Sequence, residues 1–325
     1  MNMSRPFLIL VSFLQLLLAD QSSSAQPIYP DKPIHMIVGF PPGSQPDIVA
    51  RLLGHELAAA IRTPIVVDNV TGASGTIAAE RLAKAAPDGY TLGLLSQTHV
   101  VISPILHKVA YDPLRDFSPV SQISVSPNLL VVATAVPANS VAQLVELAKS
   151  RPGLLTFASS GNGSGTHMAA ELFRSAAGID IRHIPYRGVV AAVPDLVAGR
   201  VTMMFSPLPV VLPQVREGQL RALAVTSLRR SAAMPELPTL AEAGYPGFEA
   251  TNWYGLLAPA GTPVSVVTRL HLEVIKALQL PDLRRKLTDL GIEVVGNRPD
   301  EFTSIIRADI PRWTKVIKDA AIKED

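Results

Sequence analysis

Short apolar runs rich in β-branched residues alternate with longer amphipathic runs along most of this chain. Residues 34–39, 65–69 and 91–96 have the length and composition of buried strands, and helix-like segments at 47–61 and 75–85 separate them. This order of strand, helix, strand, helix and strand is typical of a parallel sheet with right-handed crossover connections. The alternation therefore predicts an α/β fold.

A second series of the same kind begins after residue 120. Its strands are predicted at 129–133, 155–159, 181–184, 201–205 and 222–225, and its helices at 141–150, 166–177, 189–198 and 209–217. One more strand at 253–259 and three helices at 263–280, 281–290 and 299–317 complete the chain.

A chain of this length is longer than one hydrophobic core usually supports. The sequence therefore predicts two domains. We assign residues 26–124 and 253–325 to the first domain and residues 125–252 to the second. Both would contain parallel-rich sheets flanked by helices. Two chain crossings, near 123–127 and 250–253, would form a hinge between them.

The first 25 residues have the features of a cleaved export signal. Arg5 precedes an apolar stretch at 7–18, and Ser23, Ser24 and Ala25 provide small side chains for cleavage. The apolar stretch is too short to span a bilayer. We therefore expect the mature chain to begin near Gln26 in an extracytoplasmic space.

Composition excludes several functional classes. The formal net charge is +2 and the basic residues are scattered, which disfavours binding to nucleic acid or to a membrane surface. The absence of cysteine excludes a disulfide framework and a thiolate nucleophile. The histidines are dispersed, and His55 has no second histidine at metalloprotease spacing. We expect no metal and no cofactor.

Two loops rich in glycine, serine and proline are the predicted binding elements. Each joins a predicted strand to a predicted helix, where backbone N–H groups and the helix dipole can hold an anion. Ligands of open α/β sheets bind at this end of the strands. The candidate residues are Phe40, Pro42, Gly43, Ser44 and Asp47 in the first loop, and Ser159, Ser160, Gly161, Asn162, Gly163, Ser164 and His167 in the second.

The ligand expected for these loops is a carboxylate. The second loop matches neither the dinucleotide fingerprint nor the P-loop, which disfavours a nucleotide. Further candidates at strand ends are Ala73, Ser96, Tyr186, Arg187 and Ser206. Arg187 is interpreted either as a bidentate partner of a ligand carboxylate or as a surface arginine.

Three residues also invite an enzymatic interpretation. Asp47 is more plausible as a helix cap than as a catalytic acid. Ser160 and His167 lie close in sequence, but they match no triad spacing, and the motif Gly-x-Ser-x-Gly is absent from the loops. We therefore expect a binding protein rather than an enzyme, with a Ser160/His167 hydrolase as the alternative.

Several motifs, taken in order along the chain, resemble those of the substrate-binding receptors of tripartite tricarboxylate transporters, the Bug family. They include Pro41-Pro42-Gly43 with Asp47, Pro87-Asp88-Gly89-Tyr90, Ser160-Gly161-Asn162-Gly163-Ser164 with His167, and Trp253-Tyr254-Gly255. The resemblance implies a periplasmic binding protein of the type II-like, two-domain fold that closes on a small carboxylate. It also implies that loops 40–47 and 159–167 hold one carboxylate through backbone N–H groups and ordered water.

The resemblance further implies a monomer that delivers its ligand to membrane transporter subunits. Relatives usually have glycine at the position of Ser44, aspartate at that of Ser206 and lysine at that of Arg187, so the ligand is open among dicarboxylates, tricarboxylates, aromatic acids and amino acids. A sensory protein that presents its ligand to a membrane kinase is the alternative to a transport receptor.

Overall fold

The computed structural model describes residues 29–319 and residue 322. The predicted export signal at 1–25 lies outside the described residues. The chain divides into a unit Met1–Asp31 and a compact unit Lys32–Asp325, and the helices and strands of the described residues all lie in the compact unit. Among the residues described, no helix is both long and apolar enough to cross a membrane.

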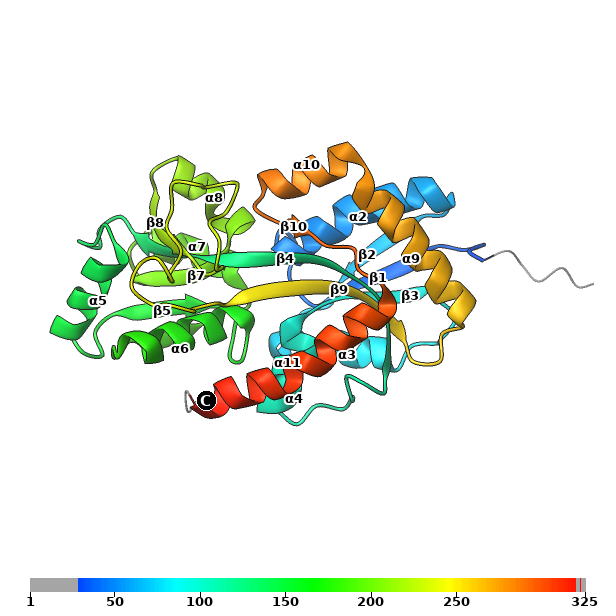
Figure 1. Ribbon diagram of the computed structural model, residues 1–325, viewed down its shortest axis with the longest axis horizontal. Coiled ribbons are helices and arrows are strands. Elements are labelled where there is room, and N and C mark those ends of the chain that lie inside the picture. The colour runs from blue at the N-terminus through cyan, green and yellow to red at the C-terminus, as the bar shows by residue number, and fades with distance from the viewer. Residues whose placement is uncertain (1–28, 320–321, 323–325) are drawn as a thin grey trace, which may run out of the picture. The chain divides into compact units, whose positions relative to one another are not determined.

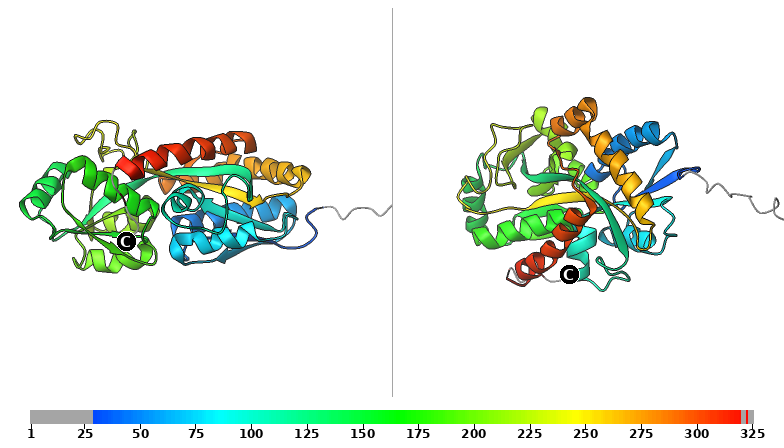
Figure 2. Two further views of the ribbon diagram at one scale, coloured as in Figure 1. Left: turned by 90° about the horizontal axis from the view of Figure 1, so that it is seen from below. Right: turned by 45° about the vertical axis from the view of Figure 1, so that its right-hand side comes forward.

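The first five regular elements of this unit form the strand and helix series predicted from the sequence. They are β1 (Ile34–Val38), α2 (Gln45–Ile61), β2 (Ile65–Asn69), α3 (Thr76–Ala83) and β3 (Thr91–Ser96). β1 pairs in parallel with β2 on one side and β3 on the other. The strands are apolar because helices lie on both faces of the sheet (Figure 2).

The second series contains four more strands and four helices. They are α5 (Val141–Ser150), β5 (Thr156–Ser159), α6 (Gly165–Ala177), β6 (Arg182–Pro185), α7 (Val189–Val197), β7 (Met203–Pro207), α8 (Leu208–Arg216) and β8 (Leu220–Val225). β5 pairs in parallel with β6 and β7. α5 and α6 contribute to one hydrophobic cluster, and α7 and α8 to another.

Two long strands run through both series: β4 (Phe117–Ala133) and β9 (Thr251–Pro259). They join the strands into one ten-stranded sheet of order β2-β1-β3-β9-β4-β7-β5-β6, with β8 and the short β10 (Glu293–Val294) paired to β4. β4 and β9 are antiparallel to each other and to their neighbours. The sheet is therefore mixed. The strands β1–β3 and β5–β7 pair in parallel, as predicted, and the antiparallel β4 and β9 lie between these two groups.

The sequence analysis also missed most of β4. It predicted only 129–133, because the preceding part of the strand carries the polar residues Ser121, Gln122, Ser124 and Ser126, which are buried in the structure. The domain boundaries proposed at 124/125 and 252/253 fall inside β4 and β9, and the division into two domains stays a prediction.

Three helices follow β9: α9 (Val264–Gln279), α10 (Pro281–Asp289) and α11 (Pro299–Asp319). α9 and α10 contact α2, whereas α11 contacts β4 and a π-helical turn, η2 (Thr98–Ile102), which precedes the short α4 (Ser103–Leu106). η2, α4 and β10 were not predicted. Phe302 of α11 lies against Trp253 and Gly255 of β9, so the C-terminal helix packs on the central strands of the sheet.

Candidate functional site

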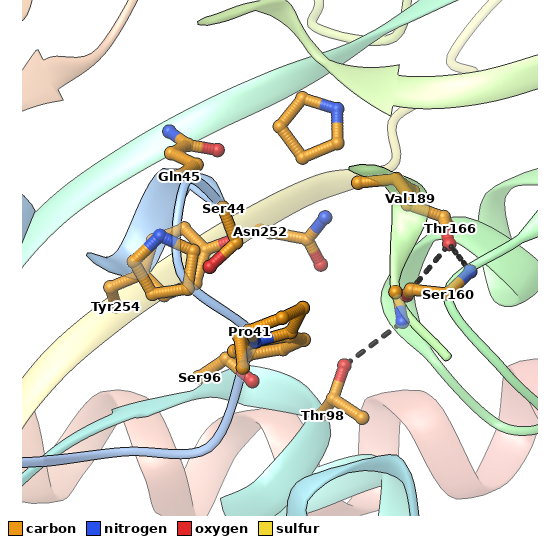
Figure 3. A pocket seen from close by; sticks show the side chains of 15 residues that line it. Pro41, Ser44, Gln45, Ser96, Thr98, Ser160, Thr166, Val189, Asn252 and Tyr254 are labelled. Carbon is orange, nitrogen blue, oxygen red and sulfur yellow. Dashed lines mark hydrogen bonds between the residues drawn. The ribbon is translucent and has the colours of Figure 1, made fainter. Parts of the chain in front are cut away.

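A cavity with an empty volume of about 420 Å³ lies at a point where four helices begin (Figure 3). Its lining includes the residues at the starts of α2, α6, α7 and α8, together with β3 and β9 residues. In Figure 3, Ser44, Gln45 and Tyr254 lie opposite Ser160, Thr166 and Val189. We call this space the front cavity.

The loop before α2 is stabilised by Asp47, a residue in the first turn of this helix. Ser44 is the extended N-cap residue, and Pro46 follows in the first turn, where its missing N–H costs nothing. Asp47 accepts the Gly43 N–H at 2.9 Å and Asn69 Nδ2–H at 2.9 Å, and it pairs with Arg51 at 2.8 Å. α2 therefore begins two residues before the predicted start, and Asp47 fixes the loop without occupying the N-cap.

These contacts determine the charge state of Asp47. Burial by itself would raise the pKa of this carboxyl, but the hydrogen bonds from Arg51, the Gly43 N–H and Asn69 outweigh that effect. The pKa of Asp47 is consequently lower than usual and the group is ionised at neutral pH. Its negative charge is already paired by Arg51.

The start of α6 is organised by hydroxyl groups. Ser164 is the N-cap and its Oγ accepts the His167 N–H at 3.2 Å, while Thr166 Oγ1 accepts the Ser160 N–H at 2.9 Å. Gly165 N–H donates to Thr98 Oγ1 of η2 at 2.9 Å. The last bond links the loop after β5 directly to the segment after β3.

Close backbone approach explains one glycine of the site. Gly188, at φ 101°, precedes α7, and a Cβ there would lie 2.8 Å from Pro41 Cγ. Because this contact joins the loop after β6 to the loop after β1, a side chain at 188 would push the two loops apart.

The front cavity is lined by apolar residues together with hydroxyl and amide side chains, and none of its lining residues is charged. Ser44 Oγ, Ser96 Oγ and Gln45 Oε1 are buried polar atoms without a hydrogen-bond partner in the described part of the chain. Unpaired buried groups of this kind are rare because each costs free energy. Together with four helix N-termini, they form an environment that favours a polar, negatively charged group.

A second cavity of about 1000 Å³ adjoins the first, and the two share Phe40, Pro41, Ser160 and Gly188. The loop 71–75 and the segment Tyr186–Arg187 complete it, and Arg187 is its one charged lining residue. Tyr186 donates its O–H to Asp195 at 2.7 Å, and burial, with this bond, raises its pKa to about 12. The Tyr186 hydroxyl therefore stays protonated at neutral pH.

The structure brings many of the predicted site residues to these two cavities. Phe40 and Ser160 line both, Ser44 and Ser96 line the front cavity, and Ala73, Gly161, Ser164, Tyr186 and Arg187 line the second. Eight others line neither: Pro42, Gly43, Asp47, Ser159, Asn162, Gly163, His167 and Ser206. Ligand binding by these eight residues stays a prediction.

The residues outside the cavities support the loops instead. Pro42 and Gly43 are exposed, and the Gly43 N–H is used by Asp47. Ser159 Oγ bonds to His183 Nε2 at 2.6 Å, and Asn162 O accepts the Ser74 hydroxyl at 2.6 Å. Ser206 lies inside β7, where its hydroxyl donates to the Pro207 carbonyl at 3.1 Å.

His167 has a structural position. Its ring is buried and stacked on His183 at 4.0 Å between centroids, its Nδ1 accepts the Gly163 N–H at 3.0 Å, and its Nε2 lies 3.8 Å from Glu171. The Ser160 hydroxyl bonds instead to Thr166 Oγ1 at 3.0 Å. These contacts give no support to a Ser160/His167 nucleophile and base.

Several lining residues were missed by the sequence analysis: Pro41, Gln45, Pro46, Thr98, Gly165, Thr166, Gly188, Val189, Pro207, Asn252 and Tyr254. Most of these residues are close in sequence to predicted site residues. The helix starts at 188–189 and 207–208 could have been identified from the sequence as further parts of the site. Thr98, Asn252 and Tyr254 come from segments that only tertiary contacts bring to the site. The described residues also contain no cluster of His, Asp and Glu side chains able to hold a metal ion.

An α/β fold with a mixed sheet and a cavity at converging helix starts is that of a periplasmic binding protein. Comparison with solved structures supports this class. Rpa4515 of R. palustris with adipate superposes with a TM-score of 0.88 at 37% identity, over 91% of this chain and 99% of that one. MatC (Rpa3494) from Rhodopseudomonas palustris with bound malate gives 0.84 at 34% identity, over 89% and 100%.

Sequence comparison identifies the family. The model of the tripartite tricarboxylate transporter family receptor matches residues 49–322. Protein BugT of Bordetella pertussis is 38% identical over 298 residues, which are 91% of this chain and 91% of BugT. The chain therefore belongs to the family of receptors of tripartite tricarboxylate transporters, as its motifs predicted. Members of this family are periplasmic solute-binding proteins.

Proposed function

We propose that this protein is a periplasmic receptor that captures a small organic carboxylate in the front cavity and delivers it to the membrane subunits of a tripartite tricarboxylate transporter. The observation that supports this most directly is the convergence of four helix starts on a cavity without charged lining residues. Carboxylates are also the ligands of the related structures with adipate and malate.

The energetics favour recognition by dipoles and hydroxyls. Each helix start contributes about 0.3–1 kcal/mol toward a nearby negative charge, and more when partly buried. Ser44 Oγ and Ser96 Oγ have no partner within the described chain, so a ligand that bonds to them satisfies groups already removed from water. A carboxylate accepts such bonds, whereas a cation would meet the positive ends of the dipoles.

The second cavity is proposed to receive the distal part of the ligand. It opens from the front cavity past Ser160 and Gly188, and Arg187 lies in its lining. A guanidinium there would pair with a second carboxylate bidentately. Ligands with two acidic ends are therefore expected to bind more tightly than monocarboxylates of the same length.

Capture is proposed to involve closure of two domains about β4 and β9, comprising residues 26–124 with 253–325 and residues 125–252. The loops that would meet on closure are already joined by the Ser74–Asn162 and Thr98–Gly165 hydrogen bonds. Binding energy would shift the population toward the closed form. The receptor is proposed to act as a monomer.

A thermal-shift panel tests the binding proposal. The chain from Gln26 to Asp325, purified by unfolding and refolding to remove retained ligand, is heated with aliphatic, aromatic and amino-substituted acids and with their amides. A ligand specific for the folded state raises stability by RT ln(1 + [L]/Kd). We expect a shift with one class of acid and none with its amide. Equal shifts for acid and amide would contradict the proposal.

Delivery to a transporter is tested in cells. A strain that lacks this gene should lose uptake of the radiolabelled acid found in the panel, and a plasmid copy should restore it. Unchanged uptake together with a lost transcriptional response to the acid would instead support a sensory role.

A further inference from the structure

Another large cavity lies on the opposite face of the strands that bound the front cavity. In β4, Ser126 faces α2, since its Oγ accepts from Gln45 Nε2, and its pairing partner in β9, Asn252, lines the front cavity. The next pair, Pro127 and Thr251, must point the other way because side chains alternate along a strand. Both line this other cavity, which we call the rear groove.

The rear groove has an empty volume of about 1200 Å³ and walls from two parts of the chain. Val125, Pro127 and Thr251 form its floor. One wall comes from the segment 227–232 after β8, and the other from α10 and the following residues 291–294. In Figure 1, α10 and β10 lie to one side of this stretch of β4 and β8 to the other.

The lining of the rear groove carries more positive than negative charge. Arg229, Arg230 and Arg284 line it, together with a single acid, Glu293. Arg230 Nε bonds to Glu242 at 2.9 Å. Arg229 and Arg284 form no ion pair with any described residue.

Arg285, the residue after Arg284 on α10, differs from Arg284 in its ion pairing. Arg285, one residue beyond Arg284, pairs with Asp282 at 2.9 Å and does not line the groove. Thus, on each wall, one of two consecutive arginines is neutralised by a carboxylate and another is left available. The two available guanidinium groups belong to opposite walls of one cavity that also carries the hydroxyls of Ser227, Ser231 and Thr288.

We propose that the rear groove is a second binding site, which takes a small doubly charged oxyanion between Arg229 and Arg284. A guanidinium binds phosphate and carboxylate oxygens with two parallel hydrogen bonds, and the hydroxyls of Ser231 and Thr288 can supply further donors. The Ser227 hydroxyl already donates to the Arg229 carbonyl at 2.6 Å. An occupant of this kind would connect the segment after β8 to α10. The inference does not depend on the proposed carboxylate function of the front cavity.

The test uses inorganic phosphate as the probe and isothermal titration of the chain from Gln26 to Asp325 at low ionic strength in a chloride buffer. We expect saturable binding, reduced about tenfold by Arg229→Gln or by Arg284→Gln and further by both together. Arg285→Gln is the matched control, because it removes the same charge one residue away. Circular dichroism melting verifies that each variant is folded.

Three results would overturn the proposal. One is the absence of saturable phosphate binding to the wild-type chain at millimolar concentrations. Another is an equal loss in Arg285→Gln, which would indicate nonspecific attraction to a basic surface. The third is a loss in Arg187→Gln with full binding in the Arg229→Gln/Arg284→Gln variant, which would place the phosphate in the Arg187-lined cavity that adjoins the front cavity.

Discussion

At the scale of single residues, the site is marked by polar atoms that the fold leaves unsatisfied. Ser44 occupies an N-cap position, yet its side chain makes no capping bond and its Oγ has no partner among the described residues. Ser140 and Ser164, at the N-caps of α5 and α6, both accept the expected backbone N–H. Ser44 thus lines the front cavity without contributing a side-chain cap to α2.

Replacing Ser44 should therefore separate binding from stability. In Ser44→Ala we expect a free energy of unfolding equal to wild type or slightly higher, because an unpaired buried hydroxyl is removed. Ligand affinity should fall about five- to tenfold. Ser140→Ala is the control, with a loss of about 1 kcal/mol in stability and unchanged affinity. Urea unfolding and calorimetric titration measure both, and a Ser44→Ala variant that binds normally would contradict this role.

Asp47 predicts a pH dependence of stability. Its folded-state pKa lies below the ordinary value of 3.8, so its contribution is present above that value and is lost as the pH falls through the folded pKa. Asp47→Asn should cost about 1–3 kcal/mol at pH 7, since the amide cannot accept from Gly43, Asn69 and Arg51 together. The difference from wild type should shrink below about pH 4.

The control for this prediction is an exposed carboxylate. Asp300 pairs with Arg298 at the surface, and Asp300→Asn should leave the free energy of unfolding close to that of the wild type at either pH. Urea unfolding at pH 7 and pH 3.5 gives the comparison. A pH-independent cost of Asp47→Asn would indicate that packing, rather than charge, accounts for the loss.

At the scale of elements, the start of α6 is placed by contacts with two distant segments. Gly165 donates to Thr98 of η2, and a Cβ on Gly165 would lie 2.1 Å from Asn252 Oδ1 of β9. The helix can approach β9 so closely only because residue 165 has no side chain. Glycine at the first position of α6 is thus required by packing between elements and not by the helix itself.

A double-mutant cycle tests this packing. Gly165→Ala should cost about 1–3 kcal/mol in stability and displace Asn252 from the front cavity, with a loss of ligand affinity. In an Asn252→Ala background the added methyl has space, and Gly165→Ala should then have little further effect on stability. Additive costs in the cycle would show that the close approach is not the cause.

At the scale of the whole molecule, the loops on the two sides of the cavities are joined by few direct bonds. Ser74 and the preceding Ala73 have positive φ values of 51° and 45°, which are uncommon for residues with side chains. This strained turn places the Ser74 hydroxyl 2.6 Å from Asn162 O in the loop after β5. The strain is thus located at one of the contacts that join the two sides.

Ser74→Ala is expected to weaken ligand binding about two- to tenfold, mainly through faster release, because the ligand-bound arrangement loses one hydrogen bond. Ser150→Ala, which removes a similar hydroxyl-to-carbonyl bond remote from the cavities, should leave binding unchanged. Stopped-flow measurement of the dissociation rate distinguishes the two. Wild-type release from Ser74→Ala would show that the bond does not help to retain the ligand.

The local sequence pattern predicted most of the helices and strands. β2, β3 and α5 have the bounds that periodicity predicted, and most other helices and strands differ by one or two residues. The loops at the helix starts could also be predicted from the sequence, because glycine, proline and hydroxyl residues after an apolar strand favour turn conformations. α2 began early because Pro46 is tolerated in a first turn.

The amino-acid sequence by itself thus determined the α/β class, the loops that carry the cavities and, through its motifs, the receptor family. The tertiary structure decided that β4 and β9 are antiparallel strands shared by both halves of the sheet, since the buried serines of β4 carry no apolar signal. It also decided which loop residues line a cavity and which support it. Ser96, Thr98, Asn252 and Tyr254 are distant along the chain from the glycine loops and reach them only because strand pairing brings those segments together.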